Sequence, residues 1–204
     1  MADDDSSPPT EPSGAPLDPA PGPDRGVEQR STGGTDGGAD GAPDGAADPA
    51  DARTVEQLLY RYAEAIDDGD FAGVADLLAD AVLHDGSGAR IAAGRDEVLA
   101  LYEATTRRHA DGTPRTQHVI TNVIVEPDPD HPHDPDRLAA RARFTVLQQT
   151  DDLALQPVVA GRYDDRFARI DRRWRFVRRV MQPQLLGDLS QHLTFDPSLL
   201  AGDG

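Results

Sequence analysis

Thr116–Val125, with the sequence TQHVITNVIV, is the stretch that decides the fold of this 204-residue chain. It is rich in β-branched residues and is bounded by Pro114 and Pro127, a pattern typical of a β-strand. Successive side chains of a strand point to opposite faces. The alternation therefore predicts one face with the even-numbered residues from His118 to Ile124, and another with the odd-numbered residues from Val119 to Val125.

Both predicted faces are mostly apolar, so we expect the strand to be covered on both sides. His118 and Asn122, the only asparagine of the chain, then share one covered face. A buried polar group without a partner costs about 1–3 kcal/mol. Another protein group or a bound ligand is therefore expected to face these two side chains.

The chain divides by composition. Residues 1–53 contain 9 of the 17 prolines, 9 of the 19 glycines and a net charge of −9, out of −17 for the whole chain. Such a segment buries too little apolar surface to offset its chain entropy. We therefore predict a disordered acidic segment at 1–52, one domain at 53–182 and a C-terminal tail at 183–204. The leucines of this tail are apolar enough to dock, either over the pocket or on a partner chain.

Several function classes are excluded by composition. The chain has no cysteine and no lysine, which excludes thiol chemistry, thiolate metal sites and Schiff-base catalysis. Its acidic balance argues against nucleic acid as a partner. No apolar run approaches the roughly 20 residues that cross a bilayer, and no secretory signal is visible. We expect a cytoplasmic protein with no membrane partner.

Three helices are predicted before the main strands. Thr54 and Gln57 have the spacing of a capping box, and apolar residues then recur at helical spacing up to Ile66. Gly69 is a natural helix end, and Asp67 lies at the edge of the apolar stripe. Asp70 is expected to cap a second, shorter helix. A third helix is predicted from Gly94 to about Ala110, after two short strands at 81–85 and 89–92.

Four longer strands are predicted at 115–126, 138–151, 157–170 and 173–181, joined by short turns such as Asp171-Arg172. Sequential strands with short connections pair as an antiparallel meander. In the last strand, Trp174 and Phe176 are expected on one face, and Arg173, Arg175 and Arg179 on the other. Helices followed by a meander predict an α+β fold in which three N-terminal helices pack on a curved, mainly antiparallel sheet.

Residues 53–181 resemble the SnoaL-like members of the nuclear transport factor 2-like superfamily. The resemblance is carried, in order, by Tyr62 with Asp67-Asp68-Gly69-Asp70-Phe71, Thr116-Gln117-His118, Gly161-Arg162-Tyr163-Asp164-Asp165 and Arg173-Trp174-Arg175-Phe176. It implies a cone-shaped α+β barrel with a pocket between helices and sheet, and a homodimer formed through the sheet. It also implies cofactor-free chemistry, as in dehydratases, ketosteroid isomerases and polyketide cyclases.

Within this family, the chain is most similar to scytalone dehydratase. The resemblance places a catalytic carboxylate at Asp67 and a catalytic imidazole at His118. The dehydratase has a tyrosine directly before that carboxylate, where this chain has Ile66, and its second pocket tyrosine corresponds to Asp85. The resemblance therefore implies acid/base chemistry without scytalone as the substrate.

The resulting hypothesis is a lyase or isomerase for a small, hydrophobic, oxygenated ring compound such as a polyketide or steroid. His118 would be the general acid/base and Asp67 would orient it, because a carboxylate fixes the tautomer of a bonded imidazole. Asn122, Tyr62 and Asp85 would bind the substrate, with no metal and no cofactor.

Structural alternatives remain for every one of these residues. His118 and Asp67 would be a satisfied core pair, Asn122 would bond to a neighbouring strand, Tyr62 would pack in the core, and Asp85 would cap its turn. The chain would then be a non-catalytic ligand-binding or dimerisation module, related to small subunits of ring-hydroxylating dioxygenases. The loop at 131–134 is interpreted as a solvated hairpin tip. The arginine-rich strand at 172–179 is interpreted as a solvated or dimer-facing side of the sheet.

Overall fold

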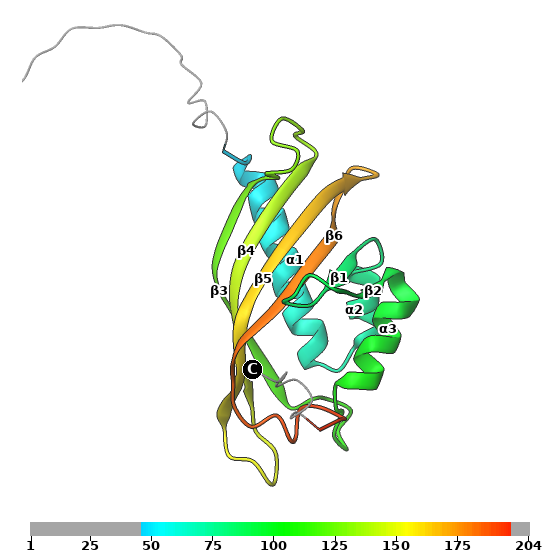
Figure 1. The fold of residues 1–204 in the computed structure, drawn as a ribbon, viewed down its shortest axis with the longest axis vertical. Helices are drawn as coiled ribbons and strands as arrows, with labels where there is room; N and C mark the ends of the chain where they lie inside the picture. The colour runs from blue at the N-terminus through cyan, green and yellow to red at the C-terminus, as the bar shows by residue number, and fades with distance from the viewer. Residues whose placement is uncertain (1–45, 197–204) are drawn as a thin grey trace, which may run out of the picture. The chain divides into compact units, whose positions relative to one another are not determined.

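The computed structural model of the chain describes residues 46–196, in which the predicted order of helices and strands is confirmed (Figure 1). The helices are α1 (Pro49–Asp67), α2 (Phe71–Leu77) and α3 (Gly94–Thr105). The strands are β1 (Val82–His84), β2 (Arg90–Ala93), β3 (Thr116–Pro127), β4 (Arg137–Gln148), β5 (Gln156–Ile170) and β6 (Arg173–Leu186). The predicted disordered segment falls mostly outside the described residues.

The strands form one curved sheet in the order β2-β1-β6-β5-β4-β3. All neighbouring strands are antiparallel except β1 and β6, which run parallel. The predicted α+β class with a mainly antiparallel sheet is therefore confirmed. The sheet does not close into a barrel, because β2 and β3 are its two edges.

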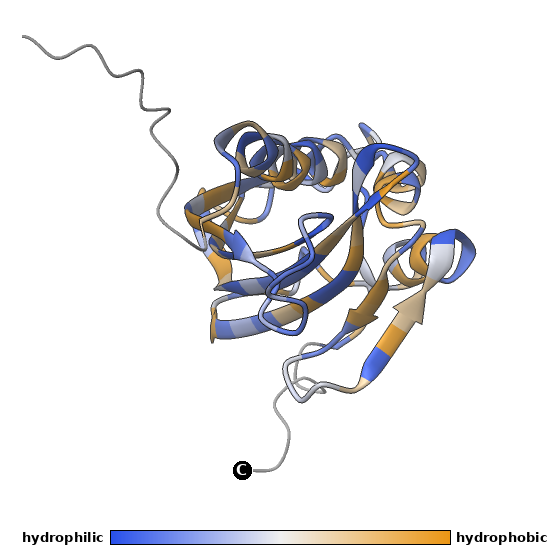
Figure 2. Ribbon diagram, turned by 90° about the horizontal axis from the view of Figure 1, so that it is seen from above, coloured by the Kyte–Doolittle hydropathy of each residue, from blue (hydrophilic) through white to orange (hydrophobic). Residues whose placement is uncertain are grey.

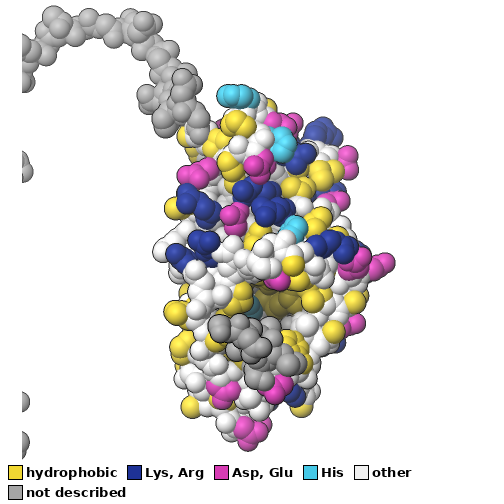
Figure 3. Space-filling view, viewed as in Figure 1, with side chains coloured by type: hydrophobic (Ala, Val, Ile, Leu, Met, Phe, Trp, Pro, Cys, Tyr) yellow, Lys and Arg dark blue, Asp and Glu magenta, His cyan; other side chains and the backbone are white. Residues whose placement is uncertain are grey.

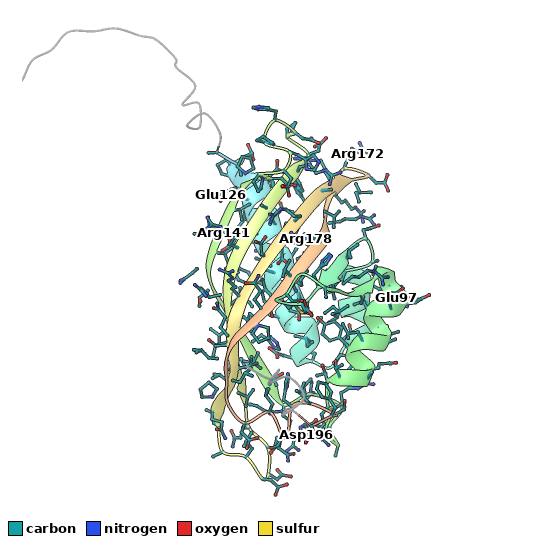
Figure 4. All side chains as sticks on the ribbon, viewed as in Figure 1. Glu97, Glu126, Arg141, Arg172, Arg178 and Asp196 are labelled. Carbon is teal, nitrogen blue, oxygen red and sulfur yellow. The ribbon has the colours of Figure 1, made fainter. Side chains whose placement is uncertain are left out.

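The helices cover one face of this sheet (Figure 2). Helix α1 packs against β3 and β6, and α2 packs against α1 and α3. The apolar stripe of α1 includes Val55, Leu59 and Ile66. These residues pack in a core with Phe167 and Phe176 of the sheet. The outer face carries charged pairs such as Arg141 Nη2 with Glu126 Oε2, 3.1 Å apart (Figure 4).

Helix α1 begins earlier than predicted. Asp48 is its N-cap and accepts hydrogen bonds from the backbone N–H groups of Ala50 and Asp51, while Pro49 occupies the first helical position. The predicted capping box is wrong, because the Thr54 hydroxyl instead donates to the carbonyl of Ala50 within the helix. The helix therefore extends into the segment that was predicted to be disordered.

Two other boundaries differ from the predictions. Helix α3 ends at Thr105, short of Ala110, and the following residues form a bridge between Thr106 and Leu193. Strand β6 continues past Pro183 to Leu186, into the predicted tail. A proline is tolerated there because β1 pairs with β6 only at residues 178–180, so that one side of β6 is unpaired at Pro183.

A β-bulge in β3 changes which residues face the helices. Thr121 pairs with Arg143 and Ile124 pairs with Arg141, so that Asn122 and Val123 together oppose one residue of β4. Asn122 adopts a positive φ of 52°, a conformation that asparagine tolerates better than most residues. The alternation reverses at this point, which leaves Asn122 exposed and Ile124 47% exposed.

The predicted shared face of His118 and Asn122 is therefore wrong. His118 and Ile120 face the helices, and after the bulge Val123 and Val125 do so. The predicted cover on both faces is also wrong, because β3 is an edge strand and Val119 is 36% exposed.

A second bulge, in β6, corrects the prediction for Arg179. Phe167 pairs with Phe176 and Arg166 pairs with Arg178, so Val177 is the additional residue. Trp174 and Phe176 are buried as predicted, but beyond the bulge the inward positions shift by one residue. Arg179 is consequently fully buried and does not share an exposed face with Arg173.

Candidate active site

Asp67, the last residue of α1, meets the start of β3. Its Oδ1 lies 2.6 Å from Nδ1 of His118 and accepts a hydrogen bond from the Thr116 hydroxyl at 2.7 Å. Its Oδ2 accepts the backbone N–H of His118 at 2.6 Å. The structure thus brings together the two residues that were predicted as the catalytic pair.

The turn after α1 allows this approach. Gly69 has a positive φ of 73°, and a Cβ at this position would lie 2.3 Å from the carbonyl oxygen of Gly112. Only glycine fits this conformation and this contact without displacement of the backbone. The end of α1 is thereby held against the loop that leads into β3.

The Asp67 carboxylate is stabilised in its ionised form. Burial raises its pKa, but hydrogen bonds and charge interaction from His118, together with the Thr116 hydroxyl, outweigh burial and hold the pKa below its ordinary value. An ionised carboxylate only accepts hydrogen bonds, so Nδ1 of His118 carries the proton of this contact. Nε2 has no hydrogen-bond partner among residues 46–196 and remains available to a ligand.

A cavity of about 510 Å³ lies beside His118, between the helices and the sheet. Figure 3 shows the corresponding hollow with hydrophobic side chains around it. Its lining is mostly apolar and aromatic, which is typical of pockets for small organic ligands. The lining residues include Tyr62, Ile66, Tyr102, His118, Phe144, Val146, Tyr163, Met181, Leu189, His192 and Leu193.

Three tyrosines form the inner wall of the cavity. The hydroxyls of Tyr62 and Tyr102 are 2.9 Å apart, and the edge-to-face contact of Tyr62 with His118 places their ring centres 6.3 Å apart. Tyr163 stacks on Phe144 at 4.4 Å. Burial raises the pKa of Tyr102 and of Tyr163 well above the ordinary value, so both are neutral phenols. Tyr62 is buried in the core and also forms part of the cavity wall.

A buried ion pair supports this wall and was missed from the sequence. Arg179 donates from Nε and Nη2 to both carboxylate oxygens of Asp165, at 3.0 and 2.8 Å. Its guanidinium lies 4.1 Å from the ring centre of Tyr62 and 4.3 Å from that of Tyr163, within cation–π range. Strict alternation of inward and outward side chains along β6 does not predict the burial of Arg179, because the bulge at Val177 shifts the inward positions.

Asp85 lies at the cavity but is occupied by its own turn. Its Oδ1 accepts hydrogen bonds from the backbone and hydroxyl of Ser87 and from the backbone of Ala89. The Ser87 hydroxyl is the main cause of its lowered pKa. Asp85 therefore caps its own turn, as in the structural alternative, and also borders the cavity.

Asn122 does not join the other predicted site residues. It lies at a depression of the outer sheet face, beside Arg141, Arg143 and Arg162, and does not line the cavity next to His118. Its predicted contact with a ligand of this cavity loses its geometric basis because the bulge turns the side chain away.

The C-terminal segment contributes a residue that the sequence reasoning missed. Residues 187–194 follow β6, and Leu189, His192 and Leu193 line the cavity. Leu189 of this tail is buried, whereas Leu185 and Leu186 are exposed, so the expected docking holds only for part of the tail. The apolar residues of the tail indicated docking, but nothing in the sequence indicated that His192 would reach the same cavity as His118.

The described residues contain no group of three or more histidine, cysteine, aspartate or glutamate side chains placed to hold a metal ion. In the loop at 131–134, His131 pairs with Asp128, whose carboxylate also approaches Arg166. No helix within residues 46–196 has the length and apolar character needed to cross a membrane.

Known proteins resemble this chain in sequence pattern and in fold. The family model for the SnoaL-like domain matches residues 48–180. No curated protein sequence matches the chain.

Solved structures share the fold at low sequence identity. An NTF2-like protein with a cystatin-like fold from Novosphingobium aromaticivorans is 20% identical, with a TM-score of 0.53 over 70% of this chain and 86% of that chain. A candidate scytalone dehydratase from the same organism is 19% identical, with a TM-score of 0.54 over 68% and 87%. The beta subunit of a candidate aromatic-ring-hydroxylating dioxygenase, also from that organism, is 18% identical, with a TM-score of 0.53 over 68% and 92%.

Proposed function

Because this chain belongs to the SnoaL-like domain family, we propose that its cavity binds an oxygenated ring compound and that His118 transfers protons on it. The reaction would be a cofactor-free dehydration or double-bond isomerisation. The observation that carries the proposal is the contact of Asp67 with Nδ1 of His118 at the wall of a mainly apolar cavity.

The cavity lining supports an uncharged ligand. No arginine is among the lining residues, and the formal negative charge there is that of Asp85, which is bound within its own turn. A carboxylate or phosphate ligand would enter this low-polarity cavity without a cation to pair with, which is costly. A hydrophobic ring with carbonyl or hydroxyl groups fits both the apolar walls and the polar groups.

The proposed dehydration needs one group that first accepts and then donates a proton. Neutral His118 would take a proton from the carbon next to a ketone through Nε2, which leaves an enolate. The imidazolium would then give this proton to the hydroxyl group on the β carbon. The carbon–oxygen bond breaks, a carbon–carbon double bond forms, water departs and His118 returns to its neutral form.

Asp67 would act on this cycle through His118. Its carboxylate holds the Nδ1–H tautomer, so that Nε2 is the acceptor, and it stabilises the imidazolium when this forms. The same groups serve an isomerisation, in which the proton returns to a different carbon of the same enolate. Tyr62, next to His118, is the proposed donor to the ligand oxygen.

Turnover of β-hydroxytetralone to naphthol, followed by absorbance, tests the dehydration, and a β,γ-unsaturated steroid ketone tests the isomerisation. We expect conversion by the wild type and a loss of about 10²-fold or more in His118→Ala, because general acid/base catalysis contributes 10²–10⁴-fold. His133→Ala, a change at an exposed loop histidine, is the matched control and should retain full activity. Equal turnover by His118→Ala would remove His118 from the mechanism.

The alternative is a ligand-binding module without catalysis, for which the shared fold with a dioxygenase beta subunit is the motivation. Under this alternative, tetralones would raise the melting temperature of the wild type without being converted. The binding assay and the turnover assay together separate the two functions.

We also propose that two copies pair through the outer face of the sheet. Exposed apolar side chains on β3 and β6, including Val119, Ile124 and Leu185, support this proposal. Ile124→Arg should shift the protein toward the monomer in analytical ultracentrifugation, whereas Leu155→Arg, at an exposed position in the loop after β4, should not. A wild type that sediments as a monomer at all concentrations would exclude the dimer.

A further inference from the structure

His192 is held at the cavity by its backbone, while its ring has no hydrogen-bond partner among residues 46–196. Its carbonyl accepts the backbone N–H of Arg107 at 2.8 Å, and its own N–H donates to the carbonyl of Leu189 at 3.0 Å. The ring borders the same cavity as His118. The backbone that carries the ring is therefore held at the cavity by hydrogen bonds.

The residues on both sides of His192 are fixed as well. The carbonyl of Gln191 accepts a hydrogen bond from the amide of Gln148 at 3.1 Å and lies 3.2 Å from Nε2 of His109. The carbonyl of Leu193 accepts from Nη2 of Arg107 at 3.0 Å. Contacts of this number on a segment without regular secondary structure indicate a built wall of the cavity, and not a loosely docked tail.

The ring itself has unused hydrogen-bonding capacity. Nδ1 of His192 is buried without a partner, and no contact satisfies Nε2 among residues 46–196. Buried polar atoms are normally satisfied, and each exception costs about 1–3 kcal/mol unless water or a ligand provides the bond. The ring of His192 therefore offers a hydrogen bond to a ligand from the mostly apolar wall of the cavity.

The ring is uncharged near neutral pH. Burial, followed by charge interaction with the nearby His118, lowers its pKa to about 4 against the opposing effect of Asp67. A neutral imidazole has one N–H donor and one acceptor nitrogen. These are the groups that bind the oxygen of a ketone or a hydroxyl without requiring a charge on the ligand.

We propose that His192 hydrogen-bonds a second oxygen atom of the ligand, so that the cavity selects ring compounds with two oxygen functions, one at His118 and one at His192. The inference rests on the proposed function in that both place an oxygenated ring compound in this cavity. The family model ends at residue 180, and His192 lies after the matched residues. In this proposal His192 acts as a specificity residue of the cavity.

Binding measured without turnover tests this role. His118→Phe, which removes the proposed base, is compared with the double variant His118→Phe/His192→Phe by calorimetric titration. The probes are β-hydroxytetralone, with two oxygens, and naphthalene, with none. Since a net hydrogen bond is worth about 0.5–1.5 kcal/mol, we expect the double variant to bind β-hydroxytetralone about three- to tenfold more weakly and naphthalene equally well.

His192→Gln in the same background keeps a donor and an acceptor and should restore part of the lost affinity for β-hydroxytetralone. Equal affinities of His118→Phe and the double variant for β-hydroxytetralone would overturn the role of His192. Equal losses for both probes would also overturn it, since they would show that the ring acts by packing alone. An absence of β-hydroxytetralone binding by His118→Phe would overturn it as well.

The proposed function fails in a different way. If the wild type does not convert β-hydroxytetralone but the affinity difference at His192 is observed, the catalytic proposal is wrong and the two-oxygen selection stands. If conversion occurs and the affinity difference is absent, the reverse conclusion follows.

Discussion

Asp67 binds His118 twice, through the ring at Nδ1 and through the backbone N–H, with one carboxylate oxygen for each and 2.6 Å for both contacts. The end of α1 and the beginning of β3 are therefore joined by the same side chain that orients the ring. Structural and chemical roles of Asp67 are combined in one group, and its removal should affect both.

Asp67→Asn should lower stability and turnover together. The amide carries no charge and can accept hydrogen bonds at only one of its two ends, so we expect a loss on the order of 2–3 kcal/mol in urea unfolding, within the range for hydrogen bonds to charged groups. A mispositioned His118 should reduce β-hydroxytetralone turnover by about 10²-fold. Asp68→Asn, at the exposed neighbouring position, is the control. Wild-type stability in Asp67→Asn would contradict the double contact.

Asn122 should matter for stability and not for ligand binding. Asn122→Val places a β-branched residue at a φ of 52°, which should cost about 1–2 kcal/mol in thermal unfolding. Asn122→Gly accepts the same φ and should cost much less. Neither change should alter the affinity for tetralone, since Asn122 lies on the outer face. A selective loss of tetralone affinity would restore its sequence-based role in ligand binding.

His192 should make the protein sensitive to acid. Its pKa is about 4 in the folded state and 6.5 as the ordinary value, so the unfolded state binds the proton first as the pH falls. Stability should therefore be fully retained above pH 6.5 and decline toward pH 4, by up to about 3 kcal/mol from this residue. Urea unfolding across this range should show a weaker pH dependence in His192→Phe than in the wild type. His133→Phe should keep the wild-type dependence.

The buried pair of Arg179 and Asp165 should be far more costly to break than its exposed neighbour on β6. Arg179→Met leaves the Asp165 carboxylate buried and uncompensated, and should cost about 3–5 kcal/mol. Arg175→Met removes the solvent-screened pair with Asp80 and should cost far less. Adding Asp165→Asn to Arg179→Met should recover part of the loss. Similar costs for both single variants would contradict the burial.

Local patterns predicted much of this molecule because they report local geometry. Helical spacing placed α1, and the strand pattern placed His118 at the start of β3, whereas the pairing of His118 with Asp67 was implied by the family resemblance. Asp48 before Pro49 is a helix-start signal in its own right. The composition around it, however, favours disorder.

The errors arose where one backbone residue changes the register of all that follow it. A single positive φ at Asn122 reverses the faces of β3, and an extra residue at Val177 buries Arg179; neither has a signal in hydrophobic periodicity. His192 was missed for another reason. Its position depends on contacts with residues 105–109 and 148, far away in the sequence, and these follow only from the complete fold.

The bulge at Asn122 is also expected to affect aggregation of the protein at high concentration. Strand β3 is 12 residues long and forms one edge of the sheet, and such an edge can recruit a further strand from a neighbouring molecule. A bulge interrupts the regular spacing of the unpaired N–H and carbonyl groups and twists the strand. Asn122, which has a positive φ in the middle of this edge strand, is therefore expected to hinder the addition of strands from neighbouring molecules.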